Sequence, residues 1–356
     1  MLDTLKIAPP EILKASERCV MTKVTMQALA DAVGVSRITV WKALTGRAGV
    51  SSEVREEIQR KAVEIGYMPA SAAPAAARER AFSVVVSRPE SSIFWMQIIH
   101  HIAKELAHHR INLLYTYMPT SYKEGYTLPA SLSPDNVDGF LVLNVNDERL
   151  LRLLAAQPVP KIFLDSVPTL PPSALNGDLV LLEGRTPVRE ITARLLESGR
   201  TRLGFVGDVN YAQTNYDRHL GFLDAHRAAG LAPDERLSLT EPLGLHSHYE
   251  QISRFLDGLD RLPDGFVCAS DFIASFISRY LQETGRRTPD SFVLTGFDDS
   301  TEYPLVAGRI TTVSVETAPL GKRLARMLIF RADYPASPYE VAYITTTPVY
   351  RGPLAR

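Results

Sequence analysis

Apolar residues along this chain follow three successive patterns. In residues 24–67 they recur at helical spacing in short runs that break at Gly34 and Gly46, which predicts a bundle of three small helices. Residues 68–80 are rich in alanine and carry two prolines, a composition typical of a linker. From Phe82 onward, short apolar runs that suit strands alternate with longer amphipathic runs that suit helices.

The alternating region divides into two stretches. The first contains FSVVV, SIFWMQIIHHIAKELAHH, NLLYTY, GFLVLN, RLLRLLAA and KIFLD, and it ends at a proline-rich segment, 168–172. The second contains TPVREITARLLESG, RLGFVG, a helix around Arg218 to Ala229, DGFVCAS, DFIASFISRYLQETG and SFVLTGFDD. Such repeats predict parallel sheets covered by helices, and two stretches predict two lobes. Because open parallel sheets bind ligands at the carboxyl ends of their strands, we expect a binding cleft between the lobes.

A length of 356 residues favours two or three folded units. The expected fold class is an all-α helix-turn-helix headpiece followed by an α/β core of two parallel-sheet lobes. We expect a tail at 1–23, the headpiece at 24–69, a hinge linker at 70–81 and the core at 82–356. Within the core we assign 82–168 and 315–335 to the first lobe, and 169–314 and 336–356 to the second.

The segment VTMQALADAVGVSRITVWKAL has the layout of a helix-turn-helix. Thr25 is expected to cap the first helix, Gly34 to form the tight turn, and Ser36 to cap the second helix. The inner face of the second helix is Val40, Ala43 and Leu44, which leaves Arg37, Ile38, Thr39, Trp41 and Lys42 toward solvent. An exposed first turn that carries an arginine suits a recognition helix in the major groove, because a guanidinium can donate two hydrogen bonds to a guanine edge.

Charge and cysteine content say more about the cellular location of the protein than about its function. The formal net charge of −1 gives no general sign of a nucleic-acid partner, although basic residues outnumber acidic ones nine to six between Thr22 and Arg80. The two cysteines, Cys19 and Cys268, fit neither a disulfide framework nor a metal-ligand spacing. Without a secretory signal or an apolar run of about 18 residues, we expect a cytoplasmic protein with no membrane partner.

Enzyme chemistry is not expected. Asp298 and Asp299 form a carboxylate pair, but no activated nucleophile or glycine-rich phosphate loop accompanies them. Four histidines at 100, 101, 108 and 109 have spacings that allow a metal pair, yet a solvated or dimer-facing surface is the favoured interpretation. We therefore expect no cofactor and no metal.

Residues 24–69 resemble the headpiece of the LacI/GalR family of bacterial repressors nearly residue for residue. The resemblance implies that Arg37, Ile38 and Lys42 touch base edges. It also implies that the phosphate backbone is held by Thr25, Ser36, Thr39 and Ser51. Trp41 stands where the family normally has a serine, which leaves that backbone contact open. For Ile38, contact with a thymine methyl and simple packing are both open.

The linker departs from the family pattern. Relatives form a hinge helix on DNA, from which a leucine enters the minor groove at the operator centre. The hinge positions here include Ala73 and Ala76, and Ala76 stands where the leucine is expected. We therefore expect a weaker or displaced hinge helix with little kinking of the operator, a result that a circular-permutation gel assay would test.

The core resembles the same family through GFDD at 296–299, RITTVSVETAPLGKRLARMLIF and the closing VYRGP. The resemblance implies periplasmic-binding-protein-like lobes that bind an effector. The implied effector-binding residues are Phe94, Trp95, Asp165, Arg218, Ser270 and Asp298. Ser270 replaces the usual asparagine, which changes one polar contact.

The expected function is that of a transcription regulator. It would be a homodimer, most simply a repressor, that binds double-stranded operator DNA and senses a small, carbohydrate-like molecule. The alternative is a DNA-binding regulator that is controlled by a protein partner or has a vestigial cleft.

Overall fold

The computed structural model describes residues 24–45, 47–67, 79–87, 92–244 and 246–355. The chain divides between Arg78 and Glu79 into two compact units, a headpiece and a core. The expected tail at 1–23 and the hinge positions Ala73 and Ala76 lie outside the described residues.

The headpiece is the predicted bundle of three short helices. These are α1 (Met26–Val33), α2 (Arg37–Leu44) and α3 (Ser52–Glu64). Gly34 has a φ of 71°, in the left-handed region, so the turn between α1 and α2 is closed by a residue without a Cβ. The core of the bundle consists of six fully buried residues, Leu29, Ala30, Val40, Ala43, Ile58 and Ala62.

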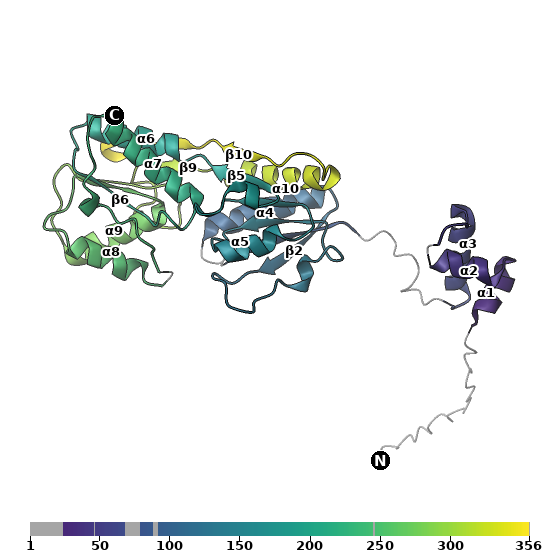
Figure 1. The fold of residues 1–356 in the computed structure, drawn as a ribbon. Helices are drawn as coiled ribbons and strands as arrows, with labels where there is room; N and C mark the ends of the chain where they lie inside the picture. The colour runs from purple at the N-terminus through teal and green to yellow at the C-terminus, as the bar shows by residue number, and fades with distance from the viewer. Residues whose placement is uncertain (1–23, 46, 68–78, 88–91, 245, 356) are drawn as a thin grey trace, which may run out of the picture. The chain divides into compact units, whose positions relative to one another are not determined.

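The first lobe of the core is a six-stranded parallel sheet in the order β10-β5-β4-β3-β1-β2. Its strands are β1 (Ala81–Val86), β2 (Asn112–Tyr117), β3 (Gly139–Leu143), β4 (Lys161–Leu164), β5 (Asp178–Leu182) and β10 (Val341–Ile344). Alternate side chains of the central strands pack on α4 (Ile93–His108) and α10 (Thr317–Asp333), and the others pack on α5 (Glu148–Ala155). The sheet is therefore covered on both faces, as its nearly continuous apolar strands predict (Figure 1).

The second lobe repeats this architecture on a smaller scale. Its parallel sheet has the order β6-β7-β8, formed by β6 (Leu203–Val206), β7 (Gly265–Cys268) and β8 (Val293–Thr295). Helices α6 (Arg185–Glu197) and α7 (Gln213–Ala228) cover one face, and α8 (His248–Asp257) and α9 (Asp271–Thr284) cover the other (Figure 1). Strands β9 (Thr312–Ser314) and β11 (Thr347–Val349) form an antiparallel pair.

Four short 3-10 helices complete the described elements. They are η3 (Ala130–Leu132), η4 (Pro172–Ala174), η5 (Glu235–Leu237) and η6 (Gly352–Leu354).

Two strands correct the expected division into lobes. Residues 169–314 and 336–356 were assigned to the second lobe, but β5 and β10 are hydrogen-bonded within the first sheet, so the assignment is wrong for both strands. The physical reason is that the apolar run DLVLL extends the parallel sheet beyond β4 before the chain crosses to α6. The chain thus passes between the lobes three times, after β5, before α10 and between β10 and β11.

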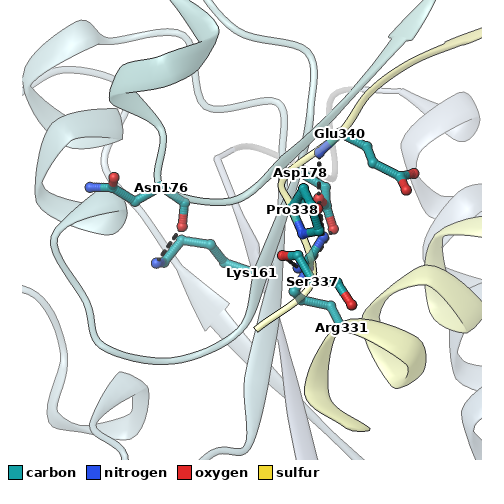
Figure 2. Close-up of polar contacts among 7 residues, drawn as sticks. All are labelled: Lys161, Asn176, Asp178, Arg331, Ser337, Pro338 and Glu340. Carbon is teal, nitrogen blue, oxygen red and sulfur yellow. Dashed lines mark hydrogen bonds and ion pairs between the residues drawn. The ribbon is translucent and has the colours of Figure 1, made fainter. Parts of the chain in front are cut away.

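A buried ion pair holds the segment that leads into β10 against the rest of the first lobe (Figure 2). Arg331, near the end of α10, donates two hydrogen bonds of 2.7 and 2.9 Å to the carboxylate of Asp178. The guanidinium also donates to the carbonyls of Ser337 and Pro338, and the amide of Glu340 donates to Asp178. Bidentate pairing and these further bonds compensate both charges for their loss of water, and they hold the segment leading into β10 beside β5.

Lys161, which Figure 2 shows on the neighbouring strand β4, is buried without such compensation. Its amine donates one hydrogen bond of 3.0 Å to the carbonyl of Asn176, and it forms no ion pair with any residue that the structure describes. Its aliphatic stem packs on Gly177, where an added Cβ would lie 2.5 Å from Lys161 Cγ. Burial lowers the pKa of Lys161 from its ordinary 10.5 to about 8.

We predict that Lys161→Met stabilises the protein at pH 7 by roughly 1–2 kcal/mol, because it removes a buried charge and loses only one hydrogen bond. The folded state binds this proton less tightly than the unfolded state. The wild type should therefore gain stability as the pH rises from about 8 toward 10.5. Urea unfolding of both proteins at pH 7 and pH 9.5 measures the effect.

The advantage of the Lys161→Met variant should shrink at the higher pH, while the exposed control Lys104→Met should give a small difference at both. A destabilised Lys161→Met variant, or a difference that does not change with pH, would contradict the assignment.

Candidate functional site

Three hydroxyl residues mark the helix N-termini of the headpiece. Thr25, Ser36 and Ser51 each accept a hydrogen bond from a backbone amide three residues later, at 3.2, 3.1 and 3.4 Å. The Ser36 and Thr39 hydroxyls are also 2.8 Å apart. N-terminal amides and capping hydroxyls suit phosphate oxygens, so these four residues have the chemistry expected of backbone contacts. That they hold DNA stays a prediction.

The exposed face of α2 carries the predicted base-reading residues. Arg37 is exposed, and Ile38 has 65% of its surface in contact with solvent. Lys42 is half-buried one turn further along, and its amine lies 3.8 Å from the position of an added Cβ on Gly49. The structure therefore places Arg37 and Ile38 together, exposed, at the start of the helix. Lys42 is less exposed, and its amine lies beside Gly49.

Trp41 and Arg55 explain how α2 is fixed at its C-terminus. The Trp41 ring is 44% exposed and has the Arg47 guanidinium 5.8 Å from its centroid, a cation–π contact. Arg55 on α3 donates to the carbonyls of Ala43 and Arg47 at 2.9 and 2.8 Å. These bonds from Arg55 to carbonyls at the C-terminal end of α2 could not be predicted from local pattern, because only the folded bundle brings the residues together.

A cavity of about 250 Å³ lies between the lobes of the core. Its lining includes Asn144, Asp165, Asp208, Ser270 and Asp298, which follow β3, β4, β6, β7 and β8 respectively. The cavity is thus built at the carboxyl ends of strands from both sheets, where the topology predicts a ligand site.

All six residues predicted to bind an effector line this cavity. Phe94 and Trp95 at the start of α4 meet edge to face, with ring centroids 5.2 Å apart. Both rings are partly buried and also pack on the apolar core. The structure brings the predicted residues to one place, and their role in binding stays a prediction.

Arg218 is the one arginine on the described lining, and it is only 5% exposed. Its Nη1 donates to the carbonyl of Ala269 at 2.6 Å, and its guanidinium carbon lies 3.6 Å from the ring centroid of Phe297. Burial lowers the pKa of Arg218, and the nearby carboxylates, first Asp298 and then Asp165, oppose that shift. Nε has no hydrogen-bond partner among the described residues, so the guanidinium retains a donor.

Asp165 joins the two lobes across the cavity. It lies at the end of β4 with a φ of 74°, and its carboxylate accepts hydrogen bonds from the hydroxyl and amide of Thr214 on α7. It also accepts from the amide of Ser166 at 2.8 Å. Burial raises the pKa of Asp165, and the hydrogen bond from Thr214 is the largest opposing influence. Its oxygens are thus already engaged by protein donors.

Asp298 has the opposite environment. Its backbone has a φ of 104°, a strained value for a residue with a side chain, and its amide bonds to the carbonyl of Val313. Burial raises the pKa of Asp298 to about 7, with Arg218 opposing the shift and Asp271 adding to it. No hydrogen bond or ion pair to its carboxylate is formed within the described part of the chain.

Ser270 lines the cavity and also caps the N-terminus of α9. Its hydroxyl accepts from the amide of Ile273 at 3.3 Å and caps α9. The next residue, Asp271, is buried and accepts from the hydroxyl of Thr312 and the amide of Ser300. Burial raises the pKa of Asp271 to about 6. Asp271 thus supports the loop that positions Asp298.

Several lining residues were not identified from the sequence. They are Ser92, Asn144, Asn146, Asp208, Tyr211, Thr214, Asn215, His248, Phe272 and Tyr303. Asn144 and Asp208 follow predicted strands, a signal that could have found them. Tyr211 and His248 reach the cavity only through the folding of connecting segments.

Over the described residues, no group of three or more His, Cys, Asp and Glu side chains is arranged to hold a metal ion. None of the helices that the structure describes has the length and apolar character needed to cross a bilayer.

Comparisons with known proteins place this architecture in context. A model of a periplasmic binding protein-like domain matches residues 192–353. The HTH-type transcriptional regulator CelR of Thermobifida fusca is 28% identical over 316 residues, which cover 86% of this chain and 91% of the relative. A structure of a CelR–cellobiose complex is 25% identical with a TM-score of 0.67, and the match covers 92% of this chain and 99% of that one.

A lac repressor dimer bound to operator DNA and the anti-inducer ONPF has the same fold. Its TM-score is 0.63 at 18% identity, and the match covers 93% of this chain and 98% of that one.

A helix-turn-helix headpiece joined to a periplasmic-binding-protein-like core defines a DNA-binding transcription regulator. The predicted fold class is confirmed, and the relatives are regulators rather than enzymes. The chain is similar over most of its length to regulators of the LacI/GalR family, which confirms the predicted resemblance.

Proposed function

We propose that this regulator binds a near-palindromic operator as a homodimer, reads bases with α2, and represses transcription until a sugar enters the cavity. The observation that carries the proposal is the cavity itself, since it is lined from both lobes and faces Arg218 and Asp298 inward. A ligand there contacts both lobes at once and favours one arrangement of them over another.

A sugar is the class of effector that the lining supports best. Aromatic rings suit the apolar faces of a pyranose, and carboxylate, amide and guanidinium groups suit its hydroxyls. Asn144 and Asn146 from the first lobe and Arg218 from the second supply such groups. The related CelR structure contains cellobiose, which makes β-linked glucosides the first candidates.

The homodimer is supported by an exposed apolar surface on the first lobe. Strand β2 is an edge of the six-stranded sheet, and Tyr115 and Tyr117 on it are 49% and 57% exposed. Ile93 and Met96 on α4 are also about half exposed, at 51% and 50%. Exposed large apolar side chains on an edge strand are normally covered by a partner, and a second copy matches the dimeric lac repressor complex.

A regulator controlled by a protein partner is the second candidate. It predicts that no small molecule stabilises the core.

We predict that Arg37→Ala and Lys42→Ala change which operator sequences are bound. Each should lose roughly 1–3 kcal/mol of discrimination at the base pair that it contacts, because a donor to a base edge is removed. Selection of bound duplexes from a random library, followed by affinity measurement on the selected operators, detects the change. The exposed α3 variant Arg60→Ala is the matched control and should keep the wild-type preference.

If Arg37→Ala selected the same operators as the wild type, α2 would not be the reading helix.

A second prediction concerns the effector. Cellobiose or a related sugar should raise the melting temperature of the full-length protein in a saturable manner, because a ligand that binds only the folded state stabilises it. At 100 times its dissociation constant the stabilisation should be about 2.7 kcal/mol. Flat melting across a panel of sugars would favour control by a protein partner.

A further inference from the structure

The described lining of the cavity has an excess of negative charge. Asp165, Asp208 and Asp298 lie on it with a single cation, Arg218, and Asp271 lies close enough to act electrostatically on Asp298. Burial raises the pKa of Asp165, Asp271 and Asp298, which shows how poorly the cavity supports these charges together. One guanidinium does not neutralise three carboxylates.

The three carboxylates differ in how many hydrogen bonds they already accept from the protein. Asp165 accepts from Thr214 and Ser166, and Asp208 accepts from the amides of Asn210 and Leu243 at 2.9 and 3.2 Å. Only Asp298, among these three, receives no hydrogen bond from the described residues.

Arg218 does not fill this gap. Its guanidinium donates hydrogen bonds to Ala269 and Asn215, its face rests on Phe297, and it forms no ion pair with Asp298 in the described structure. The Asp298 carboxylate therefore has both oxygens available to a donor on a ligand.

We propose that the effector is a sugar that carries a protonated amine, and that Asp298 binds the amine as its counter-ion. This inference rests on the sugar-sensing function proposed above. A neutral sugar would donate a hydrogen bond but would bring no positive charge, so burial would continue to favour the uncharged form of Asp298. An ammonium supplies the donor and the charge together, and charge-assisted bonds are the stronger ones.

The aromatic part of the lining agrees with a cationic ligand. Trp95 on the first lobe and Phe272 and Tyr303 on the second line the same cavity, and the rings of Phe272 and Tyr303 lie 5.6 Å apart. Aromatic faces attract ammonium groups, and more so where water is excluded. The same rings accept the apolar face of a sugar, so both halves of the proposed ligand find partners.

The test compares two disaccharides of one shape. Cellobiose and the β-1,4-linked disaccharide of glucosamine share rings and linkage and differ in having hydroxyl or amine at each 2-position. Calorimetric titration of the full-length protein at pH 7 and low salt should show at least about tenfold tighter binding of the amino disaccharide, the gain that roughly 1.4 kcal/mol of charge pairing provides. The N,N'-diacetyl derivative should lose this advantage, and added salt should reduce it.

The Asp298→Asn variant isolates the charge at nearly constant shape. It should bring the affinity ratio of amino to neutral disaccharide down to about one, while Asp260→Asn, an exposed change outside the cavity, should keep the wild-type ratio. Melting curves of both variants establish that they are folded.

The outcomes separate this inference from the function on which it rests. If cellobiose or another neutral sugar binds as tightly as its amino counterpart, the amine is not recognised and sugar sensing stands. If Asp298→Asn keeps the tenfold ratio, Asp298 is not the counter-ion and the inference fails. If no sugar of either kind binds, both the inference and the sugar-sensing function are overturned.

Discussion

The burial of the Arg218 guanidinium between two lobes is the constraint on which the site depends. Taking such a charge from water costs several kcal/mol unless its surroundings compensate it. The compensation here comes from the Ala269 carbonyl, the face of Phe297 and the field of Asp298 and Asp165, rather than from a direct ion pair within the described residues. The charge is therefore held in place while Nε stays without a protein partner. The site therefore holds its positive charge in place without a ligand.

Polar contacts across the cavity connect that site to the arrangement of the lobes. Thr214 on α7 bonds to Asp165 in the first lobe, and the Tyr211 hydroxyl donates to Asn144 at 3.2 Å. At the rim, the Glu302 carboxylate accepts from the amide of Ile93 at the start of α4 at 3.0 Å. These bonds define one relative position of the lobes, and a ligand changes DNA affinity only by preferring one such position over another. A change in the relative position of the lobes must alter backbone angles at the three segments where the chain crosses between them.

Local features of the headpiece could be predicted from the sequence because they depend on residues three or four positions apart. The caps at Thr25, Ser36 and Ser51 and the turn at Gly34 are of this kind. In the core, strands β1 to β4 and β6 to β8 and most helices also followed from apolar periodicity. The placement of β5 and β10 did not, because strand order depends on pairing between distant segments. In the cavity, residues that follow strands were accessible to prediction, whereas Tyr211 and His248 come from segments that only the folded lobes bring together.

The central claim is that a ligand in the cavity controls the headpiece through Arg218, and operator binding measures this directly. Fluorescence anisotropy with a selected operator gives the dissociation constant with and without saturating effector, for the wild type and for Arg218→Ala, with Arg218→Lys as the charge-retaining comparison. The account predicts equal affinity for DNA in the absence of effector, a shift of at least about fivefold in the wild type, and none in Arg218→Ala. A folded Arg218→Ala protein that responds to the effector as the wild type does, or that no longer binds the operator, would contradict it.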